Sequence, residues 1–353
     1  MRRVAVVGAG IGAQHLEGYL ALPDRFTVSH VCDLDRDRAQ PLCDRSGAAY
    51  APDLDSVLAD ESVDIVDICL PPHLHFSAVE AVLKAGRHAV CEKPLVASLA
   101  EADALIALSA ETGKQVFPVF QYRFGRAASQ LRALSAAGLT GKPYVASLET
   151  HWNRDAAYYA VPWRGTWKTE RGGAILGHAI HIHDWLGFVF GPVAQVYADL
   201  ATRVNDIEVE DCAALSIRMA SGALVTSSVT LGAANDTSRL RFCFEGLTAE
   251  SGSNPYKPAE DSWTFTARAP VTQAEVDAVL AGVGEAPAGY AGLFTALADA
   301  LDGKPGAEVT LEDGRRSLEF VSAVYQSHRS NAPVRLPLDR HHPLYRNWLP
   351  EAL

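Results

Sequence analysis

The chain has 353 residues, of which 48% are hydrophobic and 21% are charged, and its formal net charge at pH 7 is −11. This length allows two domains with separate cores. The acidic balance, without a lysine or arginine block, argues against nucleic acid as a partner. No apolar run reaches the length of a signal-peptide core or a membrane span, and the six scattered cysteines form no Cys-x-x-Cys pair. We therefore expect a cytoplasmic protein with reduced cysteines and no membrane contact.

A glycine-rich loop follows the first predicted strand, an apolar run over residues 4–7. Gly8, Gly10 and Gly12, with Ala13 after them, stand between this strand and a helical pattern. Glycines in this position let the backbone approach a dinucleotide pyrophosphate, which lies at the N-terminus of the helix. The sequence therefore predicts a dinucleotide site that includes these glycines and Ile11.

An acidic residue ends the second predicted strand. Asp33 comes about 20 residues after the glycine loop, where a carboxylate accepts hydrogen bonds from the adenosine ribose and repels a 2′-phosphate. This favours NAD as the cofactor. Arg36 and Arg38 lie close by and leave NADP as an alternative.

Strand and helix patterns alternate over about the first 120 residues. Apolar runs at 65–70, 88–91 and 115–120 predict strands. A predicted helix that ends at Gly86 lies between the first two, and a helix that begins with a capping box at Ser98 and Glu101 lies between the last two. Such alternation is typical of a doubly wound parallel sheet, the Rossmann arrangement. Pro41 falls inside the expected second helix, so we expect that helix to start late or to kink.

The run Cys91-Glu92-Lys93-Pro94 leaves the carboxyl end of a predicted buried strand. In an open α/β sheet this edge is where ligands bind. A half-desolvated lysine beside a nicotinamide ring could share a proton with a hydroxyl while hydride leaves its carbon. For an isolated Glu-Lys-Pro, however, a surface loop is the more common interpretation, because short motifs match by chance. The surrounding sequence therefore decides the interpretation of Lys93.

After residue 121 the periodicity changes. Residues 144–153 alternate with a period of two, and strand-like stretches follow at 193–201, 212–219, 223–231, 240–244 and 247–251, with turns at 221–222 and 245–246. Consecutive strands joined by tight turns predict an α+β domain with a large, mostly antiparallel sheet. We expect a dinucleotide-binding domain over residues 1–121, a substrate and oligomerisation domain over 122–335, and a tail, 336–353, that packs back on the protein.

Several motifs resemble the Gfo/Idh/MocA family, the glucose-fructose oxidoreductase and inositol dehydrogenase group of NAD(P)-dependent sugar and polyol dehydrogenases. These motifs are the glycine loop, Leu70-Pro71-Pro72-His73-Leu74-His75, the run from Gly86 to Pro94, and the helix start from Glu312 to Glu319. The segment Arg171-Gly172-Gly173-Ala174-Ile175-Leu176-Gly177-His178-Ala179-Ile180-His181-Ile182-His183-Asp184 is similar to a family helix that carries an Asp, a His and a later Asp. His181 matches the family His and Asp184 the later Asp, whereas Gly177 stands where the family has its first Asp.

The resemblance implies hydride transfer between a secondary hydroxyl of a sugar, glycoside or cyclic polyol and the nicotinamide. His181 would then be the general base, because imidazole titrates near neutral pH, and Lys93 would orient the oxygen, although the two roles could be exchanged. Beyond the glycine loop and Asp33, the implied cofactor contacts are Pro71, His75, Glu92 and Lys93. The implied substrate contacts are Tyr122, Arg123, His151, Asn153, Trp163, Arg164, His178 and Asp184.

Four alternatives stay open. Gly177 removes a carboxylate, which fits a catalytically silent NAD-binding sugar sensor, and the enzyme could also run as a reductase of a keto-sugar, imine or enone. His151 and Asn153 share one side of a strand, which is equally typical of a solvated polar face. The aromatic segment from Tyr158 to Lys168 is either a lid on the pocket or an oligomer contact.

Two further expectations concern metal and assembly. His178 and His181 have ligand spacing but no cysteine or carboxylate cluster beside them, and the resemblance implies a site without metal. In the family one face of the second sheet is covered by helices and the other is open. The resemblance therefore implies a homodimer or homotetramer that assembles through the open face.

Overall fold

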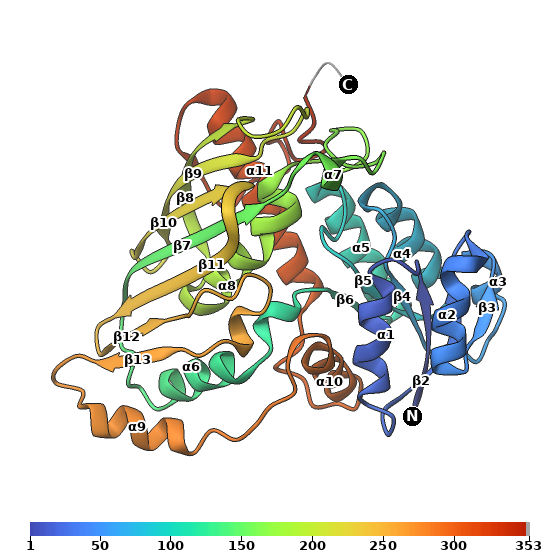
Figure 1. Cartoon of the computed structure of the whole chain (residues 1–353), viewed down its shortest axis with the longest axis horizontal. Helices are drawn as coiled ribbons and strands as arrows, with labels where there is room; N and C mark the ends of the chain where they lie inside the picture. Colours follow the sequence, from blue (N-terminus) through green and yellow to red (C-terminus); the bar gives the residue numbers. More distant parts are fainter. Residues whose placement is uncertain (351–353) are drawn as a thin grey trace. The chain divides into compact units, whose positions relative to one another are not determined.

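The computed structural model describes residues 1–350 and divides into two compact units, Met1–Gln121 with Tyr290–Leu318 and Tyr122–Gly289 with Glu319–Leu353. The sequence pattern had assigned the segment 290–318 to the second domain, and the structure corrects this assignment. The two units are described separately below (Figure 1).

The first unit is built on a six-stranded parallel sheet with the order β3-β2-β1-β4-β5-β6. Its central strands β1, β4 and β5 are almost fully buried, as expected for a parallel sheet with helices on both faces. The strands are β1 (Arg2–Val7), β2 (Phe26–Cys32), β3 (Ala49–Ala51), β4 (Ile65–Ile68), β5 (His88–Cys91) and β6 (Val116–Pro118). The helices between them are α1 (Gly12–Leu20), α2 (Arg36–Ser46), α3 (Leu54–Leu58), α4 (His75–Lys84) and α5 (Leu99–Thr112), with a 3-10 turn, η1 (Pro72–Leu74).

Helix α2 does not start late. The Asp35 side chain caps it at Asp37 and Arg38, and the helix continues through Pro41 to Ser46. The cap supplies acceptors for backbone N–H groups that have no partner inside the helix, so the first turn forms ahead of the proline.

Residues 290–318 join the first unit because they pack on α1. They comprise most of α10 (Gly289–Leu301) and the start of α11 (Leu311–Ser330). The ring of Phe294 stacks on Tyr19 with centroids 3.8 Å apart. A Cβ atom at Gly18 would come within 2.9 Å of that phenylalanine, so a glycine is needed for the approach. Figure 1 shows α10 beside α1.

The second unit contains an eight-stranded sheet with the order β13-β12-β11-β7-β10-β9-β8-β14. All neighbouring strands are antiparallel except β7 and β10. The strands are β7 (Pro143–Asn153), β8 (Val193–Ala201), β9 (Cys212–Met219), β10 (Leu224–Thr230), β11 (Gly232–Phe244), β12 (Leu247–Glu250), β13 (Thr264–Ala267) and β14 (Val334–Arg335). The remaining elements are η2 (Gln121–Arg123), α6 (Arg126–Ala136), α7 (Ala156–Tyr159), η3 (Ile175–Ala179), α8 (Ile180–Phe190), η4 (Pro258–Glu260) and α9 (Gln273–Ala281).

Helix α8 covers one face of this sheet. Trp185 is fully buried and stacks on Trp263 at 5.3 Å between centroids, and Phe190 lies edge-on to Phe242 at 5.2 Å. Burying one such side chain stabilises the fold by roughly 1.5–3 kcal/mol. The chain end also packs on this unit, since the indole N–H of Trp348 donates to the Arg171 carbonyl at 2.7 Å. The core of the second unit therefore fixes α8 against the sheet.

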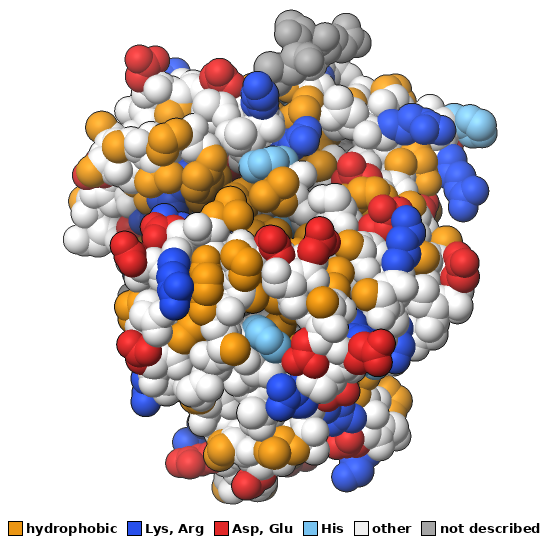
Figure 2. All heavy atoms as spheres, turned by 90° about the vertical axis from the view of Figure 1, so that its right-hand side faces the viewer, with side chains coloured by type: hydrophobic (Ala, Val, Ile, Leu, Met, Phe, Trp, Pro, Cys, Tyr) orange, Lys and Arg blue, Asp and Glu red, His pale blue; other side chains and the backbone are white. Residues whose placement is uncertain are grey.

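On the face in Figure 2, acidic and basic side chains are interspersed over the described residues. No helix in residues 1–350 is both long and apolar enough to cross a bilayer.

Candidate active site

The glycine loop between β1 and α1 has the geometry of a pyrophosphate cradle. Gly8 has a φ of +104°, and a Cβ there would lie 2.4 Å from the Cys69 carbonyl oxygen. A Cβ at Gly12 would come within 2.8 Å of Val6 on β1, so this glycine allows close packing of helix on strand. Nothing lies within 4 Å of a Cβ at Gly10, so the backbone there is open to a ligand. Helix α1 has no side-chain cap and no acid in its first turn, which leaves its N–H groups suited to an anion.

Asp33 lies next to this loop. Its carboxylate accepts the Ala9 N–H at 2.8 Å and the Asp35 N–H at 2.9 Å. Each oxygen takes one of these bonds and has a second lone pair for a ribose hydroxyl. Arg38 approaches Asp33 only at 3.9 Å and is largely exposed. The donors and acceptors of the loop and of Asp33 therefore fit a dinucleotide with a free 2′-hydroxyl.

Lys93 lies two residues after the end of β5, at the carboxyl edge of the parallel sheet. The Glu92 carboxylate, 6% exposed, accepts the backbone N–H of Lys93 at 2.9 Å. The other Glu92 oxygen lies 3.0 Å from Nε2 of His15 on α1. The path of the chain at Lys93 is thus fixed by a carboxylate that is itself held by a buried imidazole.

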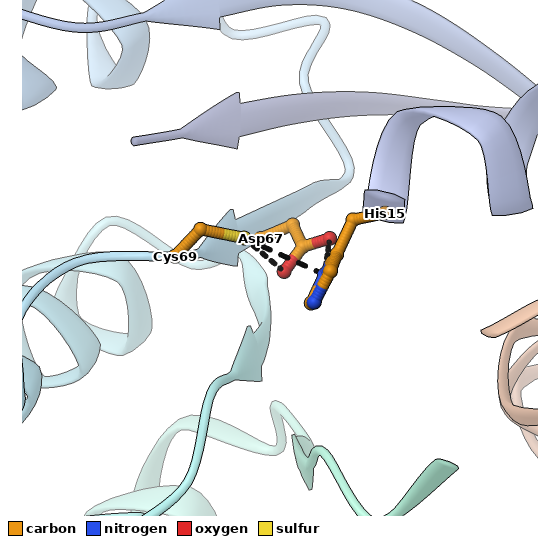
Figure 3. A group of neighbouring side chains, drawn as sticks. All are labelled: His15, Asp67 and Cys69. Carbon is orange, nitrogen blue, oxygen red and sulfur yellow. Dashed lines mark hydrogen bonds and ion pairs between the residues drawn. The ribbon is translucent and has the colours of Figure 1, made fainter. Parts of the chain in front are cut away.

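His15 is the centre of a buried polar cluster with Asp67 and Cys69 (Figure 3). Its Nδ1 lies 2.8 Å from the Asp67 carboxylate and 3.4 Å from the Cys69 sulfur. Burial is the largest influence on His15 and opposes a charge, but Asp67 and Cys69 together outweigh it, so the imidazole pKa lies well above 6.5. Burial raises the pKa of Cys69 to about 12, so its thiol is neutral at physiological pH. Sequence reasoning missed His15; its only signal was a histidine on the buried side of the first helix.

His75 contacts the two loops that follow β4 and β5. Its ring is fully buried, with Nδ1 2.7 Å from the Pro94 carbonyl and Nε2 2.7 Å from the Leu70 carbonyl. Burial lowers the pKa of this histidine, so one ring nitrogen carries a proton and one carbonyl receives it. His75 therefore lies between the loops after β4 and β5, and Pro71 lies in the first of these loops. The cofactor contacts of both residues stay predictions.

In the second unit His181 is in the first turn of α8. The ring of Tyr122 stacks on His181 with centroids 4.3 Å apart and an interplanar angle of 23°. The neighbouring Arg123 forms a bidentate ion pair with Asp184 on α8, at 2.5 and 2.6 Å. The pair connects η2, which carries Tyr122, to α8, which carries His181. The substrate contacts of Arg123 and Asp184 stay predictions.

His178 lies one residue before the end of η3, a π-helical turn that the sequence did not predict. The Tyr158 hydroxyl is 3.3 Å from its Nε2, and Trp152 meets it edge-on at 5.5 Å between centroids. The Arg164 guanidinium lies 3.7 Å from the centre of the Tyr158 ring. The aromatic segment from Tyr158 to Lys168 thus contacts His178 of η3 within the second unit. The ring of Trp163 also lies 5.1 Å from the Arg164 guanidinium.

His151 and Asn153 lie on the other face of β7. His151 bonds Ser228 at 2.9 Å, whereas the adjacent Ser227 bonds His183 of α8, so the two serines mark opposite faces of β10. The sequence left two interpretations of His151 and Asn153, a substrate contact and a solvated polar face. The structure puts their neighbour Trp152 beside His178. The alternation over residues 144–153 indicated two faces but not which one the helix would cover.

Two buried acids near the helix were also missed. Glu210 accepts the N–H groups of Gly173 and Ile175, at 3.1 and 3.0 Å, and so binds the start of the helix. Glu170 is 6% exposed, and its Oε1 would lie 3.7 Å from a Cβ at Gly177. Neither acid belongs to a motif that the sequence analysis used.

The parallel sheet, the glycine loop and the acid that follows β2 fit an NAD-binding Rossmann domain. Residues 2–120 match the family described as "Oxidoreductase family, NAD-binding Rossmann fold", and residues 128–250 match the "GFO/IDH/MocA C-terminal domain". The chain belongs to the Gfo/Idh/MocA family, which confirms the family predicted from the motifs.

Curated relatives include sugar and polyol dehydrogenases. The chain is 30% identical over 230 residues to myo-inositol 2-dehydrogenase of Thermotoga maritima, covering 63% of this chain and 66% of that protein. It is 30% identical over 195 residues to D-glucoside 3-dehydrogenase of Escherichia coli, covering 54% of each. The matches therefore span between half and two thirds of these relatives.

Solved structures match over almost the whole chain. The WlbA dehydrogenase of Chromobacterium violaceum, in complex with NADH and UDP-GlcNAcA, has a TM-score of 0.84, 28% identity and 96% coverage of both chains. Levoglucosan dehydrogenase, in complex with NADH and levoglucosan, has a TM-score of 0.78 at 18% identity, covering 95% of this chain and 99% of that one. The second likeness concerns the fold alone.

Proposed function

We propose that this oxidoreductase transfers hydride between a secondary hydroxyl of a sugar, glycoside or cyclic polyol and NAD(P). The observation that carries the proposal is Lys93, at the carboxyl edge of an NAD-binding sheet, with its backbone held by the buried Glu92 carboxylate. Two curated relatives are named as dehydrogenases of an inositol and of a glucoside, which supports a polyhydroxy substrate.

In this proposal His181 takes the proton of the reacting hydroxyl, and Lys93 orients the oxygen and stabilises its charge. The nicotinamide, when bound, would accept the hydride from the carbon that carries this hydroxyl. Tyr122 stacks on His181 and keeps its ring in one plane, which favours a fixed direction of proton transfer. The assignment of base and orienting group could be reversed between His181 and Lys93.

The test is a screen of NADH and NADPH absorbance with free monosaccharides, inositols, anhydrosugars, glycosides and UDP-sugars. Lys93→Ala should lower kcat by about 10²–10⁴-fold, because a positioned proton-transfer group is lost. The dissociation constant for NAD should stay nearly unchanged. Lys84→Ala is the matched control, since Lys84 is an exposed lysine of the same unit that pairs with Glu80 at 2.9 Å. Full turnover in the Lys93 variant would refute its assignment.

A catalytically silent NAD-binding sugar sensor is the second candidate. Gly177 favours it, because this position carries no carboxylate one turn before His181. Calorimetry separates the two candidates: a sensor binds NAD and sugar without any absorbance change. A reductase of a keto-sugar, imine or enone would show NADH consumption with the oxidised substrate in the same screen.

We also propose that the protein works in the cytoplasm as a homodimer or homotetramer. All six cysteines are free thiols, which is typical of a reducing compartment. The face of β7 and β10 opposite α8 exposes Val145 and Leu224, at 45% and 49%, and these residues are paired in register. Apolar side chains that lie side by side on a sheet face are suited to subunit contact.

A further inference from the structure

The helix that carries His181 has a gap in its side-chain surface at Gly177. A Cβ atom there would meet a single neighbour within 4 Å, the Oε1 atom of Glu170 at 3.7 Å. Gly177 and His181 are four residues apart, about one helical turn, so they lie on the same side of the helix. The space in front of Gly177 is therefore bordered by a carboxylate that comes from the preceding loop.

The loop holds Glu170 in place. The Gly165 N–H donates to Glu170 Oε2 at 2.5 Å, and the Glu170 N–H donates to the Thr166 carbonyl at 3.1 Å. The Thr169 hydroxyl donates to the Trp163 carbonyl at 2.7 Å. Gly165 has a φ of +73°, a conformation in which glycine is favoured, so the tight turn that offers its N–H depends on that residue. These contacts fix one carboxylate oxygen and direct the other toward Gly177.

The surroundings of Glu170 suit a polyhydroxy ligand. The Tyr159 ring lies beside the turn that holds Glu170, because a Cβ atom at Gly165 would come within 3.2 Å of it. Tyr158, next in the chain, bonds His178 at 3.3 Å. Aromatic rings pack on the C–H faces of sugars, and carboxylates accept hydrogen bonds from their hydroxyls. A carboxylate, two phenols and an imidazole thus border the turn before His181.

We propose that Glu170 is a substrate-binding carboxylate, which accepts a hydrogen bond from a substrate hydroxyl beside the one that His181 deprotonates. A loop residue thereby supplies the acid that the helix lacks at position 177. The inference rests on the proposed function and extends it, because it also accounts for Gly177 in an active enzyme. It predicts a substrate with at least two neighbouring hydroxyls.

The test compares three variants with the substrate that gives the strongest signal for the wild type. Glu170→Gln keeps an oxygen for the Gly165 N–H but removes the charge. It should lower kcat/KM by about 10- to 100-fold, the usual value of a hydrogen bond to a charged group. Glu170→Gln/Gly177→Asp places a carboxylate on the helix, where the open space accepts a side chain, and should recover at least part of the loss. Glu208→Gln is the control, because this acid accepts the Trp167 N–H at 2.9 Å in an adjacent segment.

The outcomes are distinct. A wild type without activity on any substrate refutes the proposed function and, with it, this inference. An active wild type and a Glu170→Gln variant within about threefold of its kcat/KM refute only the role of Glu170. A loss that the double variant does not recover, or that Glu208→Gln shares, assigns the effect to loop geometry and also refutes it. Loss, recovery and an unaffected control, with unchanged NAD affinity in all variants, support the proposal.

Discussion

At the scale of single residues, the first unit buries two carboxylates behind the cofactor edge of its sheet. Asp67 is fully buried and Glu92 is 6% exposed, and both contact the ring of His15. Buried carboxylates destabilise a protein strongly unless a positive partner compensates them. A doubly protonated His15 provides one N–H for each carboxylate. The orientation of Glu92, and through it the backbone of Lys93, therefore depends on the charge of a histidine that does not itself reach the surface.

This charge state is testable by replacing Asp67. In ¹⁵N-histidine NMR spectra at pH 8, His15 of the wild type should show both ring nitrogens protonated, and Asp67→Asn should show a neutral ring, because the group that raises its pKa is gone. Since the folded pKa lies above 6.5, the contribution to stability is full below that pH and is lost as the pH rises through the folded value. Spectra of His15→Gln assign the signals.

Two results would contradict a charged His15 in this cluster. A neutral His15 in the wild type at pH 8 would contradict the ion-pair interpretation. His15, Asp67 and Cys69 also present ligand atoms within 4.8 Å of one another. Stoichiometric zinc in dialysed protein that disappears in Cys69→Ala would show that the cluster holds a metal instead.

At the scale of elements, the start of the α8 segment depends on Glu210. Besides the two backbone N–H groups, its carboxylate accepts the Tyr325 hydroxyl at 3.1 Å, so one acid joins η3 to α11. Burial nevertheless raises the pKa of Glu210 to about 7 from 4.5. The hydrogen bonds favour the ionised form, but they do not fully compensate the loss of solvation.

The predicted consequence is a pH-dependent stability of the second unit. Because folding favours protonated Glu210, the free energy of unfolding should fall as the pH rises from 4.5 to about 7, by about 3 kcal/mol from this residue alone. Glu210→Gln should remove that slope. The measurement is urea unfolding from pH 4.5 to 8, with Glu208→Gln as the control that keeps the wild-type slope. A variant whose slope equals that of the wild type would contradict the prediction.

Strands with a clear alternation of side chains were predictable from the sequence, but the elements that pack against them were not. Strands β8 and β9 begin and end at the predicted residues, since each alternates buried and exposed side chains over its length. The same alternation in β7 did not reveal that α8 covers the face of Trp152 and leaves His151 on the other. Glu170 directly precedes the motif of residues 171–184, and His15 follows the glycine loop. Their contacts with Gly177 and with Asp67 depend on the fold, which the spacing of the motifs does not reveal. The π-helical turn at 175–179 likewise has no periodic signature in so short a segment.

At the scale of the whole molecule, the chain returns to its first unit after most of the second is complete. Arg315 pairs with Asp103 at 2.5 Å, and Gly314 lets α11 pack closely on Leu95 and Pro118. Helix α11 therefore begins in the first unit and ends in the second. The domain boundary predicted from the change of periodicity at residue 121 does not include this return to the first unit. The helical patterns of α10 and α11 do not indicate which unit each helix packs against. Neither unit is a continuous segment that could be truncated cleanly.

The proposed assembly gives the prediction at this scale. Val145→Glu/Leu224→Lys places opposite charges side by side on the exposed face of β7 and β10, where they leave the monomer's own sheet intact but introduce charge into an apolar contact. Light scattering after size exclusion should report a dimer or tetramer for the wild type and a monomer for this variant. Leu34→Lys is the control: it removes an exposed leucine from the first unit, 92% accessible, and should not change the mass. A wild-type monomer, or a variant with the wild-type mass, would exclude this face as the subunit contact. An assembly through this face would have to bury both charges in an apolar contact, and the loss of their solvation would dissociate it.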